Sequence, residues 1–451
     1  MRTALMKSAL VTPMAVATLA VLAILVASSL VTAQTLRIYH IDVNQADATL
    51  FVSPSGNTML VDGGTRYDED EIKAVMHLAG VQDIDHFVCT HYHADHTGSI
   101  WKLVEELGVS IGAAYDRGDT AFVSNGIKET GTYRNYQRVI GPMSRQLMRG
   151  ESIPLDDAMS VRCLAHGGVV LGEEDPPTTG RNENDMSIAL IIKYGSFHYF
   201  IGGDLEAPTE QKIAARDLVM DVDVYQSNHH GSDTSSSLEF MQDLSPTLIV
   251  ISNGNDGGYE HPQQSTLDRY ASLSGPPTVL QTNRYTEGGS GGNVSDAFIA
   301  DLEYSGDEGM ILVTVDASAG NYQVSYRDTT ITFLTTNRLT AVPGLVIESL
   351  LPDPEGNATV ERRLEEVTLR NSGQSDVSLT GWTLTDKTGR AWTLGGATVH
   401  PDESVVIVRN GMPMNLNNRG DRIYLRDRND SVIDEFEYGR AVEGEPILTG
   451  H

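Results

Sequence analysis

The stretch CTHYHADHTG, residues 89–98, places three histidines and one aspartate within six positions. These are His91, His93, Asp95 and His96, in a chain of 451 residues that holds only 13 histidines. The apolar run HFVC leads into the stretch and the amphipathic segment GSIWKLVEELG follows it, so the cluster is predicted where a strand gives way to a helix. Imidazoles and a carboxylate at this density indicate a metal site.

The spacing of the cluster suggests which of its side chains face the same metal ion. Histidines two residues apart on an extended segment point to the same side, so we expect His91 and His93 to share one metal ion. Asp95 and His96 follow in a turn and are expected to face a second ion. Neutral imidazoles with a carboxylate suit zinc, and manganese becomes suitable if more oxygen is present. The prediction is therefore two divalent metal ions, with zinc first and manganese as the alternative.

The N-terminus has the features of an export signal. Arg2 and Lys7 precede an apolar stretch from about Met14 to Leu30, and small residues end it before Gln34. We expect residues 1–33 to be a signal peptide, with a retained membrane anchor as the alternative. In the first case the remaining chain is secreted or periplasmic, with no membrane contact after removal of the signal.

Composition excludes some functions. The formal net charge is −29, and loss of the two cations Arg2 and Lys7 with the signal would make it −31. Such a surface repels polyanions at long range, which argues against a large nucleic-acid-binding face. Two cysteines, Cys89 and Cys163, do not form a disulfide framework, and whether they pair stays open.

The pattern along the chain divides it into two domains. Residues 34–336 alternate short apolar runs with glycine-rich turns; 35–43, 48–54 and 58–64 are predicted strands, and 68–80 is a predicted helix that ends at Gly80. Sheets covered by helices are expected here. After a linker at 337–344, residues 345–440 have the closely spaced turns of an all-β sandwich, and 441–451 are expected to form a C-terminal tail.

THYHADHTG resembles the HxHxDH motif of the metallo-β-lactamase superfamily. The Asp-Gly-Gly turn at Asp62 and the stretches FHYFIGGDLEAPTE and DVYQSNHHGSDTSS fit the same family in order. Together with NENDMSIAL and GYEHP, the set is most similar to the ComEC-like branch of the superfamily, which also contains phosphorylcholine esterase-like hydrolases. The resemblance implies an α+β fold in which four layers form an αβ/βα sandwich with the metal site at its edge.

The resemblance also implies roles for residues outside the cluster. Asp204 would bridge the two metals, and one of His229 and His230 would bind metal while the other contacts substrate or solvent. His261 either holds a substrate anion as a catalytic residue or has a structural role at its turn. Asp62 would orient a metal-bound histidine and not bind the metal itself.

One further ligand position stays open. Many relatives supply another histidine before the bridging aspartate, and His166 is the only candidate between His96 and His198. The ComEC-like branch instead has an N-x-N-x-x-S stretch near the site, which here contains Asn184.

The implied function is hydrolysis. A water shared by two cations becomes a nucleophile near neutral pH, and Asp95 is expected both to bind metal and to orient that water. A phosphodiester, in a small molecule or in extracellular DNA, is the expected substrate, so nucleic acid is a partner only as substrate. The alternatives are a choline-phosphate ester, a lactone, an amide, or a non-catalytic secreted adhesion or scaffold protein.

Residues 345–440 resemble a lamin-tail domain, an immunoglobulin-like sandwich. The resemblance rests on residues spread over the segment, among them Asn371, Gly381, Trp382, Asp386, Asn417, Gly420, Asp421 and Tyr438. Trp382 and Trp392 are expected to pack in its core or on a sheet face. The domain is expected to bind a surface, a substrate or a protein partner in an accessory role.

Overall fold

The computed structural model describes residues 35–118, 120–173, 182–216, 218–219, 221–255, 258–303, 309–335, 345–356, 363–373, 376–401, 403–426 and 432–449. The predicted signal peptide and the predicted linker at 337–344 lie outside these residues. Among the helices in the described ranges, none is long and apolar enough to cross a bilayer.

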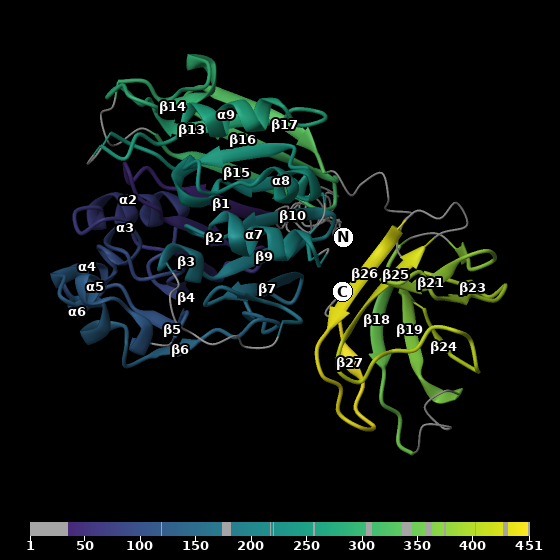
Figure 1. Cartoon of the computed structure of the whole chain (residues 1–451). Coiled ribbons are helices and arrows are strands. Elements are labelled where there is room, and N and C mark those ends of the chain that lie inside the picture. The colour runs from purple at the N-terminus through teal and green to yellow at the C-terminus, as the bar shows by residue number, and fades with distance from the viewer. Residues whose placement is uncertain are drawn as a thin grey trace, which may run out of the picture. The chain divides into compact units, whose positions relative to one another are not determined.

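Two mixed sheets form the first domain (Figure 1). The nine-stranded sheet has the order β17-β16-β15-β1-β2-β3-β4-β5-β6 and the eight-stranded sheet the order β14-β13-β12-β11-β10-β9-β7-β8. The strands of the first sheet are β1 (Leu36–His40), β2 (Thr49–Val52), β3 (Thr58–Val61), β4 (Ile84–Val88), β5 (Ile111–Asp116), β6 (Ser144–Gln146), β15 (Ile311–Asp316), β16 (Asn321–Tyr326) and β17 (Thr329–Leu334). Those of the second are β7 (Met159–His166), β8 (Val169–Val170), β9 (Ala189–Tyr194), β10 (Phe197–Ile201), β11 (Val224–Gln226), β12 (Leu248–Ile251), β13 (Thr278–Asn283) and β14 (Ile299–Asp301).

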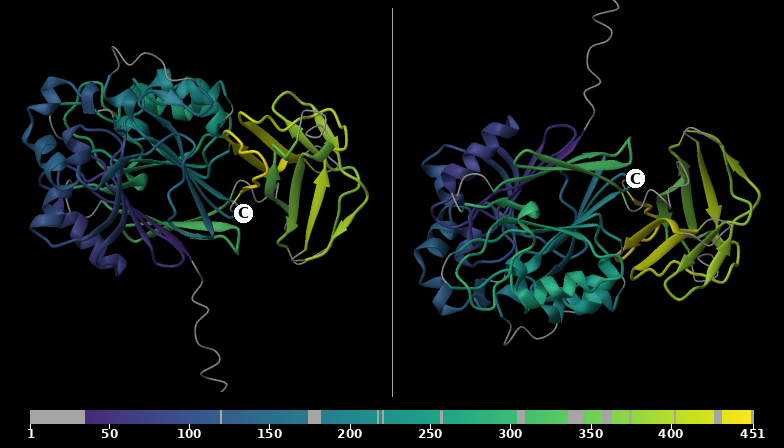
Figure 2. Two further views of the ribbon diagram at one scale, coloured as in Figure 1. Left: turned by 90° about the horizontal axis from the view of Figure 1, so that it is seen from below. Right: turned by 90° about the horizontal axis from the view of Figure 1, so that it is seen from above.

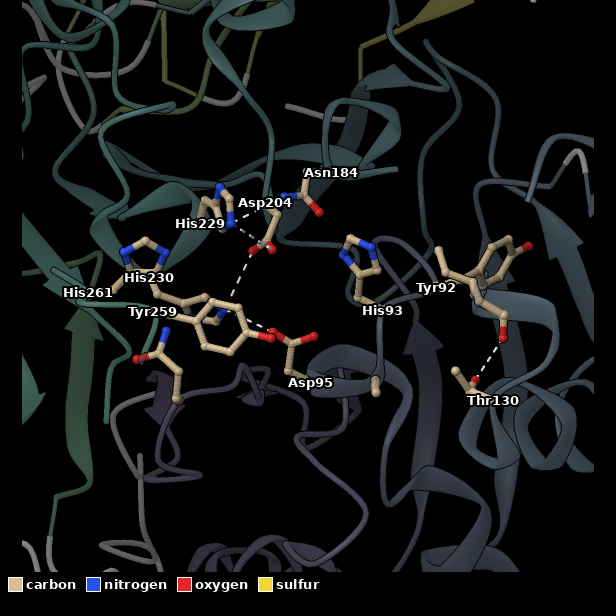
Figure 3. A pocket seen from close by; sticks show the side chains of 13 residues that line it. Tyr92, His93, Asp95, Thr130, Asn184, Asp204, His229, His230, Tyr259 and His261 are labelled. Atoms are coloured by element: carbon tan, nitrogen blue, oxygen red, sulfur yellow. Dashed lines mark hydrogen bonds and ion pairs between the residues drawn. The ribbon is translucent and has the colours of Figure 1, made fainter. Parts of the chain in front are cut away.

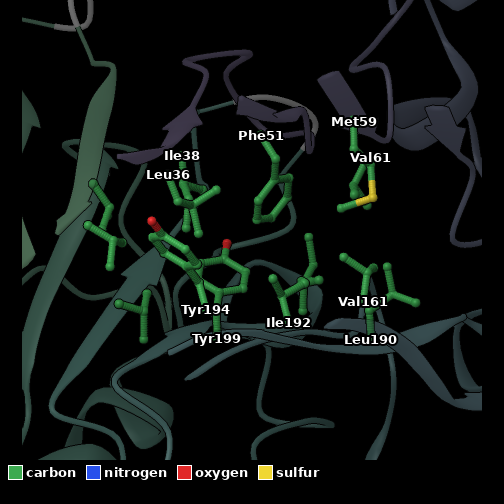
Figure 4. Packing of buried hydrophobic residues seen from close by; sticks show 14 of the residues in the cluster. Leu36, Ile38, Phe51, Met59, Val61, Val161, Leu190, Ile192, Tyr194 and Tyr199 are labelled. Carbon is green, nitrogen blue, oxygen red and sulfur yellow. The ribbon is translucent and has the colours of Figure 1, made fainter. Parts of the chain in front are cut away.

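The two sheets pack face to face and helices cover their outer sides (Figure 2). Between the sheets, Ile38 and Phe51 of the first sheet meet Leu190 and Tyr199 of the second in a buried apolar core (Figure 4). The outer face of the first sheet packs against α2 (Glu69–Ala79), α4 (Ile100–Glu105) and α6 (Gly131–Val139). That of the second sheet packs against α7 (Ala207–Ala214), α8 (Leu238–Leu244) and α9 (Gln264–Ala271). The predicted four-layered sandwich is confirmed.

Local sequence explains these elements. On β1, Ile38 points into the core between the sheets and Tyr39 points to the helix side, because neighbouring strand residues face opposite ways. Helix α2 carries three acidic residues in its first turn and ends at Gly80, whose φ of 76° is a left-handed cap, as the sequence predicts.

Parallel strands decide where the site forms. Strands β3 to β6 run parallel to one another, and so do β10 to β14. The segments that leave the carboxyl ends of β3, β4, β10 and β11 contain Asp62, the 91–96 cluster, Asp204, and the His229–His230 pair. The predicted site residues thus come from the edge at which α/β sheets ordinarily bind ligands.

The C-terminal domain is an all-β sandwich with its own core, as predicted. One sheet has the order β24-β19-β18-β27, a second has β22-β21-β25-β26, and β20 pairs with β23. Trp382 and Trp392 are buried in the core between the sheets, where the Trp392 indole donates a 2.8 Å hydrogen bond to the Met414 carbonyl. The strands are β18 (Leu345–Leu351), β19 (Glu366–Asn371), β20 (Val377–Ser378), β21 (Thr383–Asp386), β22 (Ala391–Thr393), β23 (Thr398–Val399), β24 (Ser404–Val408), β25 (Asp421–Arg426), β26 (Val432–Tyr438) and β27 (Ile447–Leu448).

The predicted C-terminal tail at 441–451 needs correction. Ile447 and Leu448 pair with Leu350 and Ser349 of β18, so this segment adds an edge strand to the sandwich. A two-residue strand is too short to produce an alternating pattern in the sequence.

Candidate metal centre

The 91–96 cluster lies at the transition from β4 to the short helix α3 (Ala94–Thr97). His91 and His96 are fully buried, and Asp95 is partly exposed at the first turn of α3. His91 Nε2 and His93 Nδ1 lie 3.0 Å apart, so these two imidazoles converge as the spacing predicts.

Two groups of potential ligand atoms meet at this point. The first comprises His91, His93 and Asp204, whose ligand atoms lie within 4.8 Å of one another. The second comprises Asp47, His96, Asp204 and His230 under the same limit. Asp204 belongs to both groups, which is the arrangement required of a bridging ligand.

Each carboxylate oxygen of Asp204 lies near a different pair of histidines, and Figure 3 shows its contacts with His229 and His230. Oδ1 lies 3.2 Å from His96 Nε2 and 3.6 Å from His230 Nε2. Oδ2 lies 3.6 Å from His91 Nε2 and 3.7 Å from His229 Nε2.

The structure distinguishes the two neighbouring histidines that the sequence left open. His230 is buried, and its Nδ1 lies 3.0 Å from the Ser252 carbonyl, which leaves Nε2 directed at Asp204 and at Asp95 Oδ2, 3.5 Å away. His229 Nε2 lies 3.2 Å from the Asn184 amide nitrogen at the wall of the pocket. His230 therefore belongs to the second group, whereas His229 lies outside both groups, beside Asp204 Oδ2 and Asn184.

His229 and His230 lie in a turn and not on a strand. Strand β11 ends at Gln226, and His229 and His230 have positive φ angles of 51° and 54° in a tight turn. A buried carboxylate holds this turn: Glu210 accepts hydrogen bonds from the Asn228 amide at 2.8 Å and from two backbone N–H groups of 236–237 at 2.7 Å. Because successive residues of the turn are left-handed, both rings reach Asp204, which strand geometry would not allow.

Asp62 occupies the orienting position that the resemblance implies. Its Oδ2 lies 2.8 Å from His96 Nδ1, which directs His96 Nε2 toward Asp204. The backbone N–H and the hydroxyl of Thr90 both donate to the same carboxylate, at 2.8 and 2.7 Å. A carboxylate fixed in this way selects the tautomer of a metal-binding histidine.

The remaining predicted residues divide between the pocket and its surroundings. A pocket of about 290 Å³ opens beside the two groups, and Asn184 and His261 line it. The rings of His261 and His229 are 5.3 Å apart, and burial beside His230 and His229 lowers the pKa of His261 to about 3. His166 ends β7 outside both ligand groups and outside the pocket lining.

One supporting pair was not predicted from the sequence. Arg117, which is buried, forms two hydrogen bonds with Glu183, Nε to Oε1 at 2.8 Å and Nη2 to Oε2 at 2.7 Å. Glu183 Oε1 also accepts the backbone N–H of Tyr92, the residue between His91 and His93, at 3.0 Å. The pair therefore ties the metal-binding stretch to the segment that carries Asn184.

The electrostatics of the centre fit a cation. His96 Nε2, His230 Nε2 and Asp204 Oδ1 are buried and form no hydrogen bond. Burial works against the charge of Asp204, but the nearby His96, His229 and His230 outweigh it and hold the Asp204 pKa well below its usual value. Burial, together with the nearby His96, His93 and His229, keeps the pKa of His91 well below normal, so this imidazole is neutral, the form that binds metal. These donors fit the predicted divalent ions, while the individual ligand assignments remain predictions.

Two family models match the chain. The model of the metallo-beta-lactamase superfamily matches residues 41–130, and the model of the Lamin Tail Domain matches residues 339–440. The first match includes the whole 91–96 cluster, and the second coincides with the C-terminal sandwich.

Several curated proteins are similar to parts of the chain. ComE operon protein 3 of Bacillus subtilis is 26% identical over 244 residues, which are 50% of this chain and 29% of that protein. Recombination protein 2 of Haemophilus influenzae is 35% identical over 89 residues, 20% of this chain and 11% of that protein. Competence protein ComA of Neisseria gonorrhoeae is 32% identical over 91 residues, 20% of this chain and 13% of that protein. The match thus spans less than a third of the length of each of these relatives.

Solved structures are similar at low identity. Igni18, a metallo hydrolase from Ignicoccus hospitalis, has 14% identity and a TM-score of 0.34 over 58% of this chain and 97% of that one. Zn(2+)-bound PqqB from Methylobacterium extorquens has 14% identity and a TM-score of 0.34 over 52% of this chain and 85% of that one. From the sheet order, the ligand groups and the two family models together, the chain consists of a metallo-β-lactamase domain followed by a lamin tail domain.

Proposed function

We propose that this protein is an exported hydrolase that cleaves phosphodiester bonds with a metal-activated water. The observation that carries the proposal is the position of Asp204 between two groups of imidazole and carboxylate donors. Two divalent ions bound there would supply a nucleophilic water and positive charge for the attacked group.

The residues around the donors have distinct tasks in this proposal. Asp95 faces the pocket, within 3.5 Å of His230 Nε2, where its carboxylate can orient a water molecule and accept its proton. In the same pocket, the Asn184 amide and the neutral ring of His261 can donate hydrogen bonds to a substrate anion.

A phosphodiester is favoured over an amide or a lactone by two observations. The non-bridging oxygens of a phosphodiester carry negative charge that paired cations neutralise, whereas amides and lactones are neutral in the ground state. The relatives named for competence and recombination belong to processes that handle DNA, which supports a nucleic-acid phosphodiester as the substrate class.

A small phosphodiester, such as a choline-phosphate ester, is the second candidate. Among the described residues that line the pocket, none is lysine or arginine, and the chain has a formal charge of −29. A long polyanion gains little long-range attraction from such a surface. A small ester needs only the local charge of the metal centre.

The decisive experiment compares substrate classes on the purified full chain loaded with Mn²⁺ or Zn²⁺. We expect turnover of bis-p-nitrophenyl phosphate, and then of either single-stranded DNA or p-nitrophenylphosphorylcholine, with no turnover of a lactone or nitrocefin. His77→Ala, at an exposed position on α2, is the matched control for the site variants and should keep full activity. Turnover of the lactone or nitrocefin alone would contradict the proposal.

Export is a separate part of the proposal and has its own test. Expression with the native N-terminus in a bacterial host, followed by mass spectrometry of the released protein, should give a chain that begins at Gln34. A chain that keeps residues 1–33 in the membrane fraction would support the anchor alternative. We further propose that the lamin tail domain holds the enzyme at a surface, a substrate or a protein partner.

A further inference from the structure

Asp47 lies beside the other members of the second ligand group, although it belongs to no metal-binding sequence motif. It sits in the segment between β1 and β2, and its side chain is 3% exposed. A carboxylate oxygen of Asp47 lies within 4.8 Å of the ligand atoms of His96, Asp204 and His230. Its backbone is fixed at both ends, because its N–H donates to the Asp95 carbonyl and its carbonyl accepts from Gly64 N–H.

The hydrogen bonds around Asp47 leave one oxygen without a partner. Oδ1 accepts from the Gln226 amide nitrogen at 3.1 Å. That amide is fixed in orientation, because Gln226 Oε1 accepts from the Thr49 and Tyr199 hydroxyls, both at 2.8 Å. Oδ2 of Asp47 is buried and forms no hydrogen bond. A buried carboxylate with an unpaired oxygen is strongly destabilising unless a cation compensates for it.

An ordinary ion pair does not account for this carboxylate. His230 Nδ1 is 4.0 Å from Asp47 Oδ1, but the same nitrogen lies 3.0 Å from the Ser252 carbonyl, which accepts its proton. The nitrogen of His230 that faces the centre is Nε2, which also forms no hydrogen bond. Asp47 Oδ2 and His230 Nε2 therefore both lack a hydrogen bond at the same group of atoms.

We propose that Asp47 is an additional ligand of the metal ion held by His96, Asp204 and His230. This inference rests on the metal centre of the proposed function and is independent of its substrate. With Asp95 at its rim, the second site then has three carboxylates and two imidazoles, whereas the first site has two imidazoles and the shared Asp204. Oxygen-rich donor sets favour Mn²⁺ over Zn²⁺ more than nitrogen-rich sets do, so the two sites should differ in metal preference.

Asp47→Asn in the full chain tests the proposal. The amide keeps the size of the side chain and an acceptor for Gln226 but removes the charged ligand. Metal-free protein is titrated with MnCl₂, and bound Mn²⁺ is followed by calorimetry and electron paramagnetic resonance. The wild type should bind two ions, and Asp47→Asn should bind one with unchanged affinity and the other at least about tenfold more weakly, the lower end of the losses seen for altered metal-site partners.

Asp42→Asn is the matched control. Asp42 is also a buried carboxylate in the segment after β1, but it bonds to Asn283 and to the Asn44 and Gly309 backbone N–H groups, away from both ligand groups. The Asp42→Asn protein should bind two Mn²⁺ ions as the wild type does. Circular dichroism of the metal-free variants separates loss of fold from loss of metal.

The possible results separate this inference from the proposed function. Wild-type affinity for both ions in Asp47→Asn overturns the inference and leaves the metal centre intact. Wild-type protein that binds no Mn²⁺ or Zn²⁺ overturns both. If Asp47→Asn fails to fold, Asp47→Glu decides: the longer side chain moves the carboxylate by one methylene, so a changed affinity for one of the two ions supports the inference, and wild-type affinity for both ions contradicts it.

Discussion

Asp204 is the residue on which both ligand groups depend. It follows two glycines at the end of β10, and Gly203 has a φ of 53° with no room for a side chain, since an added Cβ would meet the Thr90 hydroxyl at 2.4 Å. This turn aims one oxygen of Asp204 at each group. Loss of a ligand that two metal sites share should weaken both sites, whereas loss of an unshared ligand should weaken only one.

We therefore predict different metal contents for Asp204→Asn and His93→Ala. The first variant should bind less than one equivalent of metal, because both groups lose a charged donor. The second should retain about one equivalent, because His93 belongs to the first group only. Both should lose more than about 100-fold in phosphodiesterase activity, which exceeds the loss typical of outer-shell partners. Elemental analysis of dialysed protein measures the content, and two retained equivalents in Asp204→Asn would contradict a bridging role.

Asp42 gives a pH-dependent prediction away from the metal. Burial raises its pKa from 3.8 to about 6, against the hydrogen bonds from Asn283 and the backbone. The folded state thus holds this proton more tightly than the unfolded state, so its contribution to stability is present below pH 3.8 and is lost as the pH rises through 6.

At about 1.4 kcal/mol for each pKa unit, this loss amounts to about 3 kcal/mol. The free energy of unfolding of the wild type relative to Asp42→Asn should fall by most of this amount between pH 4 and pH 7.5. Urea unfolding of both proteins at the two pH values measures the difference. A constant difference would show that Asp42 is ionised in the folded state throughout.

Residues of the metal centre could be predicted from the sequence where several of them lie close together in the chain. His91, His93, Asp95 and His96 form a dense local pattern, and the resemblance extends it to Asp204 and the 229–230 pair. Asp47 stands between two alanines with no other metal-binding side chain beside it, and it meets His96 only because β1, β2 and β4 share a sheet. An isolated aspartate carries no sequence signal for a contact that tertiary structure creates.

At the level of elements, the sequence predicts the strands better than the turns between them. Buried strands such as β9, β10 and β12 produce apolar runs that are visible in the sequence. The left-handed turn at His229 and His230 contradicts the simple continuation of β11, because Glu210 of α7 holds it through Asn228. Such support comes from another element and has no local signal.

The Arg117–Glu183 pair gives a prediction about how elements are joined. It links the end of β5 to the segment before β9 and fixes the Tyr92 N–H within the metal-binding stretch. Arg117→Met leaves Glu183 as an uncompensated buried charge and should cost about 3–5 kcal/mol of stability. Arg117→Met combined with Glu183→Gln should cost less than Arg117→Met alone, because the amide is neutral and still accepts the Tyr92 N–H. Urea unfolding measures both, and additive losses would contradict this coupling.

For the whole molecule, the resemblance predicts the layers but not the order of strands. The nine-stranded sheet pairs β15 with β1, although about 270 residues separate the two strands in sequence. Apolar patterns show that a strand has two buried faces, but they do not identify its neighbours. The division into two domains was visible in the sequence because composition and turn spacing change near residue 337.

Two separate cores imply two separate unfolding transitions. The sandwich of residues 345–449 has its own apolar cluster, and the members of both ligand groups all lie between Asp47 and His230 in the first domain. Metal should therefore stabilise one domain only. At a free metal concentration of 100 times the dissociation constant, each bound ion adds about 2.7 kcal/mol to the free energy of unfolding. This should raise the melting temperature of the metallo-β-lactamase domain by about 5 °C or more.

Calorimetry of the full chain, with Mn²⁺ and then with excess chelator, tests this prediction. One transition should move to lower temperature when the metal is removed, and the other should stay within about 1 °C. The lamin tail domain alone, residues 345–451, identifies the insensitive transition by its melting temperature. Asp204→Asn should abolish the metal-dependent shift and leave the second transition unchanged, since the substitution lies outside the sandwich. Equal shifts of both transitions would mean that the domains unfold as one cooperative unit.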